Sequence, residues 1–225
     1  MVGVGALERD VKGPNRDRVN YTESSDPDLV RLCQRGDERA AAELVSRFER
    51  PVFSLVYRMV RDRELAEDLS QDVFVRTFNN LRRYDPSYKF SSWLFKIAYN
   101  LTIDHLRKRE LDTVSIHGTP DAVTEERRQA TSIVIESIDE RPDERVEARE
   151  LAGELEAAIT RLRPDYRTAI LLRHVEGRAY EEIAQIMDIP LGTVKTYIFR
   201  ARRELRETLG HLVAETGETP TERAP

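Results

Sequence analysis

The sequence has 225 residues, of which 40% are hydrophobic and 34% charged, and its formal net charge is −5. This length suffices for two small domains with separate cores, and the negative balance argues against a protein that coats nucleic acid without selectivity. The single cysteine, Cys33, cannot form an internal disulfide, which fits a reducing compartment. The four histidines are scattered, and no apolar run approaches the roughly 18 residues of a membrane span. We therefore expect no metal, no cofactor, no membrane insertion and a cytoplasmic location.

The N-terminal part predicts an arm followed by two helices. Residues 1–25 are rich in glycine, asparagine, serine and charge without periodicity, so we expect disorder there. Helices are expected after this arm, with Pro27 in a first turn. Asp37 is the expected cap of a second helix, which continues to about Arg61. Pro51 lies inside this second pattern and predicts a kink or a split.

A third helical pattern carries an apolar stripe and an acidic face. The stripe consists of Leu65, Leu69, Val73, Phe74 and Phe78. The acceptors on another face are Glu67, Asp68, Gln71 and Asp72, with no basic residue between them. Such a face is either simply solvated or a docking surface for a basic partner.

A fourth helical pattern combines aromatic and basic side chains. Ser91 or Ser92 is its expected N-cap. Its buried stripe is Leu94, Ile97, Ala98 and Leu101, and its polar face holds Lys96, Asn100 and Arg107. The preceding loop and helix start contain the aromatic residues Tyr84, Tyr88, Phe90 and Trp93 among the bases Arg82, Arg83 and Lys89. This combination suits unpaired bases, because every base offers a π-face and every nucleotide a phosphate; core packing is the alternative for the rings.

The composition changes after this helical domain, which we place at residues 26–112. Between Thr113 and Glu150 there are ten acidic and five basic residues with little periodicity, so residues 113–145 are expected to form a flexible acidic linker. A short apolar run, Ser132–Ile138, could dock on a partner.

A second helical domain is expected over residues 146–211, before a disordered tail at 212–225. Within it, Ile183 and Met187 anchor a short helix, a turn follows at residues 188–192, and a longer helix starts near Thr193. Two helices joined by such a turn are typical of a helix-turn-helix. The longer helix should bury Val194, Ile198, Ala201 and Leu205 and point Lys195, Thr196, Phe199 and Arg200 away from the core, where base edges would be read. The alternative is a solvated basic helix.

Two strings resemble a known family. AEDLSQDVF followed by FSSWLFKIAYNLTIDHLRKR closely resembles conserved region 2 of sigma-70 family initiation factors, with the small extracytoplasmic-function (ECF) group as the nearest match. AYEEIAQIMDIPLGTVKTYIFRAR resembles region 4 of the same family. Here Ala179 replaces a usual serine cap, which should cost about 1 kcal/mol of helix start. Asp188 replaces a usual glycine in the turn, where aspartate tolerates the left-handed region.

The resemblance implies an all-α protein of two small helical domains, a region 2 bundle and a region 4 helix-turn-helix joined by the linker. It implies a specificity subunit of bacterial RNA polymerase that does no catalysis itself and binds the beta and beta-prime subunits of the core enzyme, promoter DNA and an anti-sigma factor. Core binding would fall on Asp68, Leu69, Gln71 and Asp72. Melting and holding the −10 element would involve Asn80, Arg83, Tyr84, Phe90, Ser91, Trp93, Lys96, Asn100 and Arg107. Reading the −35 element as duplex would involve Thr193, Lys195, Thr196, Phe199, Arg200 and Arg203.

Two alternatives belong to other classes. A stand-alone two-domain regulator would explain the helix-turn-helix but neither the acidic helix nor the aromatic loop. A nucleic-acid enzyme or its accessory subunit would need clustered carboxylates for a metal, and the acids of the third helix have no matching set elsewhere in the sequence.

Overall fold

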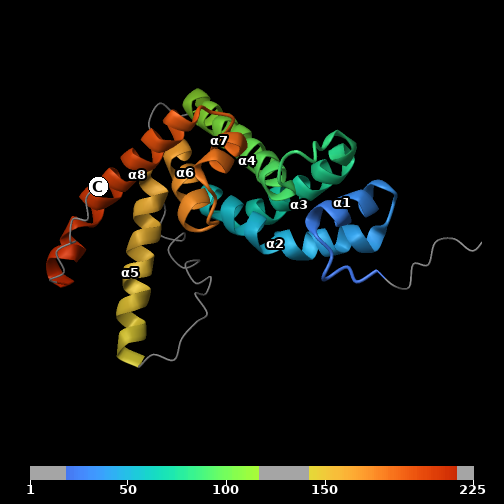
Figure 1. Cartoon of the computed structure of the whole chain (residues 1–225). Helices are drawn as coiled ribbons and strands as arrows, with labels where there is room; N and C mark the ends of the chain where they lie inside the picture. The colour runs from blue at the N-terminus through green and yellow to red at the C-terminus, as the bar shows by residue number, and fades with distance from the viewer. Residues whose placement is uncertain (1–18, 117–141, 217–225) are drawn as a thin grey trace, which may run out of the picture. The chain divides into compact units, whose positions relative to one another are not determined.

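The structure, a computed structural model, describes residues 19–116 and 142–216, and side chains within 19–109 and 151–210 (Figure 1). Every regular element of these residues is helical, as expected. The α-helices are α1 (Asp26–Gln34), α2 (Glu38–Val60), α3 (Arg63–Asn80), α4 (Phe90–Ile116), α5 (Pro142–Arg161), α6 (Pro164–His174), α7 (Tyr180–Met187) and α8 (Leu191–Thr216). A 3₁₀ turn, η2 (Leu81–Arg83), follows α3.

Short polar side chains set the starts of the first three helices. Ser25 accepts a hydrogen bond from the Asp28 amide at the start of α1. The expected cap by Asp37 is confirmed, because its Oδ1 accepts from the amides of Arg39 (3.0 Å) and Ala40 (3.2 Å). Asp62 caps α3 in the same way, since its Oδ1 lies 3.1 Å from the amide nitrogen of Leu65.

The structure narrows one sequence-based expectation about helix boundaries and shows that another is wrong. The helix α2 continues through Pro51, so of the expected kink or split the split does not occur. A proline removes one donor from the helical hydrogen-bond ladder, and the burial of Val52 and Leu55 in the turn after it favours the continuous helix. The expected caps Ser91 and Ser92 lie inside α4 and are buried, because the helix already begins at Phe90.

The outer boundaries differ from the expected ones by a few residues. The helix α4 continues to Ile116 and α5 begins at Pro142, so both extend into the stretch expected to be a linker. Proline suits the first turn of a helix, which accounts for the start of α5. The helix α8 continues to Thr216, into the stretch expected to be a tail. The apolar run Ser132–Ile138 lies outside the described residues, as does most of the N-terminal arm.

The chain divides into two compact units, one ending at Arg47 and the other beginning at Phe48. In the first unit, Arg47 fixes the entry to α1. Its guanidinium donates to Asp26 and Glu43, each at 2.8 Å, and to the carbonyl oxygens of Tyr21 and Thr22. Arg47 of α2 thereby ties both the segment before α1 and the first residue of α1 to α2.

In the second unit, α4 is buried on two faces. The expected stripe of α4 is confirmed, since Leu94, Ala98 and Leu101 are buried and Ile97 is partly buried. A further row on α4, formed by Phe95, Tyr99 and Ile103, joins one continuous apolar core with Leu55 and Met59 of α2 and with residues of α6, α7 and α8. The helices α4 and α7 therefore lie against each other, as Figure 1 also shows.

Candidate nucleic-acid interface

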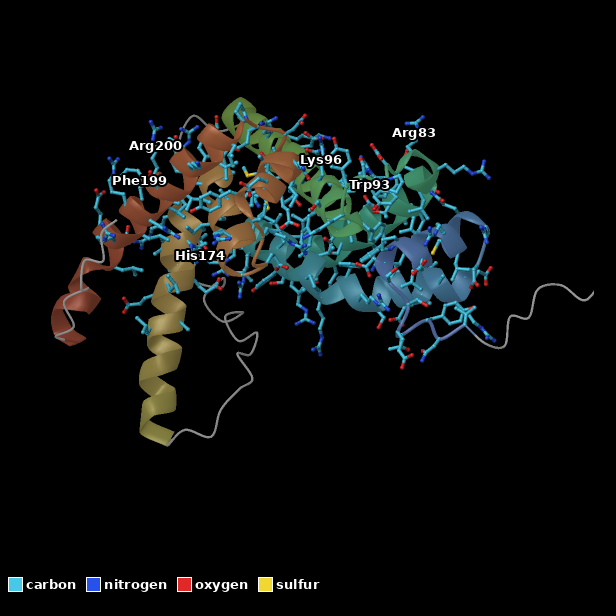
Figure 2. All side chains as sticks on the ribbon, viewed as in Figure 1. Arg83, Trp93, Lys96, His174, Phe199 and Arg200 are labelled. Carbon is cyan, nitrogen blue, oxygen red and sulfur yellow. The ribbon has the colours of Figure 1, made fainter. Side chains whose placement is uncertain are left out.

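The outward face of α8 presents a continuous set of polar and aromatic side chains. Val194, Ile198 and Ala201 are each 1% exposed or less and Leu205 is partly buried, which confirms the expected buried face. Opposite them, all of the residues expected to read duplex DNA except the half-buried Thr193 are exposed: Lys195, Thr196, Phe199, Arg200 and Arg203. Phe199 is 67% exposed, although burial would be the default for a phenylalanine. Figure 2 shows Phe199 and Arg200 projecting from α8.

A buried tyrosine fixes one of these side chains. The Arg200 guanidinium donates to the Tyr166 hydroxyl of α6 at 3.0 Å. Tyr166 is only 4% exposed and packs against Tyr197, with the two ring centroids 5.2 Å apart. The hydrogen bond to Tyr166 raises the pKa of Arg200 above its ordinary value. Two residues later, the Arg202 guanidinium lies 3.1 Å from Nε2 of His174, so α8 has a second polar contact with α6.

The turn before α8 has the geometry that its sequence predicts. Asp188 has φ 57° and ψ 46°, which confirms that it takes the left-handed conformation at the end of α7. At the other end of α7, Ala179 supplies no side-chain cap, as expected. The Glu182 carboxylate accepts from the Ala179 amide at 2.9 Å, which is the other of the two bonds of a capping box. Sequence analysis noted the missing serine but missed this second bond, which the motif A-x-x-E could have signalled.

The aromatic residues before α4 form a packed cluster. Phe90 lies 5.6 Å from Phe48, 5.8 Å from Tyr84 and 6.1 Å from Trp93, measured between ring centroids. Tyr84 and Phe90 are buried, and the Tyr84 hydroxyl donates to the carbonyl oxygen of Tyr88 at 2.5 Å. These two rings therefore hold the loop in shape rather than offering open faces.

The same loop leaves several groups accessible. Trp93 is partly buried, Arg83 is exposed, and Tyr88 is 50% exposed. Figure 2 shows Trp93 and Lys96 on α4 and Arg83 at the 3₁₀ turn. Tyr88 is absent from the site residues expected from sequence, although it is the loop ring with the most open face. Asn80 is half-buried and donates to the Arg76 carbonyl at 2.8 Å, which anchors the end of α3.

The expected polar face of α4 is solvent-accessible toward the C-terminal end of the helix, whereas near the N-terminal end its side chains contact other residues of the chain. Asn100 and Arg107 are exposed. Lys96 is partly buried, and its ammonium lies 3.2 Å from the Asp188 carboxylate. Ser91 is 7% exposed and accepts a hydrogen bond from Arg178 at 2.8 Å. Both partners belong to the segment that carries α7, which sequence analysis did not place beside α4.

The acidic face of α3 is solvent-exposed. Asp68, Gln71 and Asp72 are exposed, whereas Leu69 is 8% exposed and belongs to the apolar side of the helix. Glu67 pairs with Arg63 one turn earlier, at 2.9 Å. Within the side chains that the structure describes, neither Asp68 nor Asp72 has an ion-pair partner. The local field of this face is therefore negative and unneutralised.

Neither a metal cluster nor a membrane helix is found among the described residues. No group of three or more histidine, cysteine, aspartate or glutamate side chains is placed there to hold a metal ion. No helix in residues 19–116 and 142–216 is both long and apolar enough to cross a membrane.

Comparison with known families matches both halves of the chain. Residues 44–111 match the model of sigma-70 region 2, and residues 152–205 match that of sigma-70 region 4. The two matches follow each other in the order found by sequence analysis. The first match covers α3 with most of α2 and α4, and the second runs from the middle of α5 to the middle of α8.

Relatives match over nearly their whole length. The ECF RNA polymerase sigma factor SigW of Bacillus subtilis is 36% identical over 81% of this chain and 96% of its own length. The RNA polymerase sigma-H factor of Pseudomonas aeruginosa is 34% identical over 86% of this chain and 98% of its own. The ECF RNA polymerase sigma-E factor of Escherichia coli K12 is 33% identical over 84% of this chain and 96% of its own length.

Two solved structures share the fold. The sigma factor RpoE of Bartonella quintana, solved in complex with the anti-sigma factor NepR, matches with a TM-score of 0.60 and 22% identity over 75% of this chain and 96% of its own. CnrH, solved with the cytosolic domain of CnrY, matches with a TM-score of 0.58 and 22% identity over 84% of this chain and 99% of its own.

Proposed function

The chain belongs to the ECF group of the sigma-70 family, and we propose that its two DNA-contacting surfaces and its acidic helix divide the work of promoter-specific transcription initiation. The observation that carries this proposal is the presence of both conserved regions in one chain, in order, with relatives aligned over at least 96% of their length. A chain that carried region 4 alone would bind duplex DNA without any means of opening it.

The face of α8 suits the −35 element as duplex. Lys195 and Arg200 can donate to guanine, Thr196 to either kind of base edge, and Phe199 can contact a thymine methyl. Thr193 and Arg203 lie at the two ends of the same face and would contact phosphates. The Tyr166 hydroxyl supports this role, because it holds Arg200 before DNA arrives and so lowers the entropy lost on binding.

The loop before α4 and the polar side of α4 suit the −10 element as single strand. Arg83, Lys96, Asn100 and Arg107 would follow the strand backbone and its bases, and Trp93 would stack on a base. Tyr84 and Phe90 are buried and would act indirectly, by holding the loop in shape. Asn80 would also act indirectly, because its side chain anchors the end of α3. We add Tyr88 to this site because its ring is half-exposed.

The acidic face of α3 suits a basic partner. We assign Asp68, Gln71 and Asp72 to core polymerase, with Leu69 supporting the helix from its apolar side. We further propose contacts to both the beta and beta-prime subunits, a location with the polymerase in the cytoplasm, and no catalytic activity of the chain itself, since the polymerase supplies the chemistry. The solved complexes of RpoE and CnrH support an anti-sigma partner.

The stand-alone regulator is not favoured, because the matched relatives are sigma factors along both regions. The deciding experiment is run-off transcription with purified core polymerase, this protein and a library of promoter sequences. Enrichment of a two-part motif that depends on the added protein supports the proposal and identifies the promoter. Binding of duplex DNA by the protein alone, without any transcript, would support the regulator instead.

A further inference from the structure

The segment from Arg178 to Asp188 covers the start of α4, where the single strand is proposed to bind. Two carboxylates of this segment pair with lysines of the strand-binding side. Asp188 lies 3.2 Å from the Lys96 ammonium, and Glu182 lies 2.8 Å from the Lys89 ammonium. Arg178 completes the contact by donating to the Ser91 hydroxyl at 2.8 Å.

The chemistry of these pairs resembles that of a nucleic-acid strand. A phosphate group would offer Lys89 and Lys96 an anionic oxygen, and Glu182 and Asp188 offer the same. Burial raises the pKa of Glu182, but hydrogen bonds from Lys89 and from the Ala179 amide outweigh this effect and lower it. Glu182 is therefore a carboxylate anion at neutral pH, and it competes with a nucleic-acid phosphate for the Lys89 ammonium.

Apolar packing holds the carboxylates in place. The Arg178 guanidinium lies 4.6 Å from the centroid of the Phe95 ring on α4. Phe95 itself is fully buried and shares its apolar core with Ile183, Ile186 and Met187 of α7. The pairs Lys89–Glu182 and Lys96–Asp188 thus lie at the polar edge of the apolar interface between α4 and α7.

A second set of contacts joins the same parts of the chain. Glu156 of α5 pairs with Arg61 at 2.6 Å and with Arg58 at 3.3 Å, both near the end of α2. Arg167 of α6 donates to the carbonyl oxygen of Met59 at 2.7 Å. The helices of region 4 are therefore attached to those of region 2 at two separate places.

We propose that α7 is an intramolecular competitor of the −10 strand. In this closed form Glu182 and Asp188 occupy two cations of the strand-binding side, while the duplex-reading face of α8 stays open, with Phe199 67% exposed. The strand must displace α7 before it can contact Lys96 and Ser91. The inference rests on the proposed function, because it takes α4 as the strand-binding helix.

Competition of this kind has a measurable size. The apparent dissociation constant for the strand is the intrinsic one divided by the fraction of open molecules. An exposed ion pair changes such an equilibrium by about two- to threefold, and two such pairs by about four- to ninefold. Removal of both pairs should therefore tighten single-strand binding by roughly three- to tenfold when the closed form dominates.

The test is the full-length double variant Glu182→Gln with Asp188→Asn. Glutamine keeps an oxygen that can accept from the Ala179 amide, and asparagine tolerates the left-handed conformation, so both local roles of the carboxylates remain. The matched control is Glu49→Gln with Glu181→Gln. These residues are exposed on α2 and α7, and their replacement removes the same total charge.

Two measurements separate this inference from the proposed function. The first is the affinity of each variant for mixed-sequence fluorescent DNA, single-stranded and duplex. The second is the distance between spin labels at Glu64→Cys and Gly210→Cys in a Cys33→Ser background, which needs neither polymerase nor promoter. Glu64 is exposed on α3, and nothing lies within 4 Å of a Cβ added at Gly210 on α8.

The expected result is a three- to tenfold gain in single-strand affinity over the control, unchanged duplex affinity, and a larger population of long label distances. Equal single-strand affinity in variant and control overturns the competition, whatever the transcription assay shows. A gain in affinity with unchanged label distances also overturns it, because opening would then play no part. A gain with opened distances in a protein that supports no transcription would leave the competition standing and refute the polymerase function alone.

Discussion

Reversal of the charge at Asp72 should separate core binding from folding. Asp72 is exposed on α3, one turn after Asp68, and neither carboxylate has an ion-pair partner among the described side chains. Two like charges four residues apart destabilise a helix by about 0.2–0.5 kcal/mol. Asp72→Arg removes this repulsion and faces Asp68 with a cation, but it also places a like charge one turn before Arg76, so the free energy of unfolding should change by no more than a few tenths of a kcal/mol.

The effect on binding should be far larger. Replacing one partner of an interfacial charge pair by a like charge costs about 2–5 kcal/mol, which corresponds to a roughly 30- to 5,000-fold loss of affinity. The assay is a titration of labelled protein with purified core polymerase, alongside thermal unfolding of the free protein. Glu49→Arg is the control, since it makes the same charge change at an exposed position of α2.

The reasoning is refuted if Asp72→Arg binds core polymerase as tightly as Glu49→Arg does. A loss of binding accompanied by a fall in thermal stability would refute the claim that this face takes no part in folding. Only a selective loss of binding supports the acidic face of α3 as the docking surface.

Three further predictions concern stability and promoter reading. Glu156→Gln should lower the unfolding free energy by about 2 kcal/mol, because its carboxylate is only 23% exposed and pairs with both Arg58 and Arg61; thermal unfolding should show a Tm lower by about 4–8 °C. Ala179→Ser should raise the unfolding free energy by about 1 kcal/mol in urea titrations, since a hydroxyl would cap α7. Arg200→Ala should reduce discrimination at one upstream base pair by roughly five- to hundredfold, as measured by competition between duplexes.

Each of these predictions has its own contrary outcome. A Tm for Glu156→Gln equal to that of Glu49→Gln would show that the paired arginines contribute nothing to stability. An unchanged urea midpoint for Ala179→Ser would mean that a hydroxyl at this position adds no stabilising hydrogen bond to the start of α7. Loss of affinity for all duplexes alike after Arg200→Ala would mark Arg200 as a phosphate contact rather than a base contact.

The sequence alone predicts much of the local structure, because the relevant signals lie within one or two turns of chain. The period of 3.6 residues separates the buried Val194, Ile198 and Ala201 from the exposed face of α8. Asp37 caps its helix with a side chain that reaches two or three residues ahead. Asp188 adopts the left-handed turn that its short polar side chain tolerates.

The boundaries and roles around the start of α4 depend on contacts from farther along the chain. Ser91 has the composition of an N-cap, yet it is buried and bonded to Arg178, 87 residues later. Tyr84 and Phe90 have the composition of stacking platforms, yet they pack with Phe48 and Trp93 in a cluster. Aromatic composition cannot distinguish these two fates, because both bury a ring against a flat partner.

The second buried face of α4 is the feature that only the tertiary structure decided. Phe95, Tyr99 and Ile103 recur at helical spacing beside the expected stripe, and a helix that is apolar on two sides signals burial on both. Periodicity shows that a face is apolar but carries no information on which helix covers it. The structure shows that α7 packs against this face. The pairs Lys96–Asp188 and Lys89–Glu182 join residues some 90 positions apart, and the sequence alone does not show that such distant residues meet.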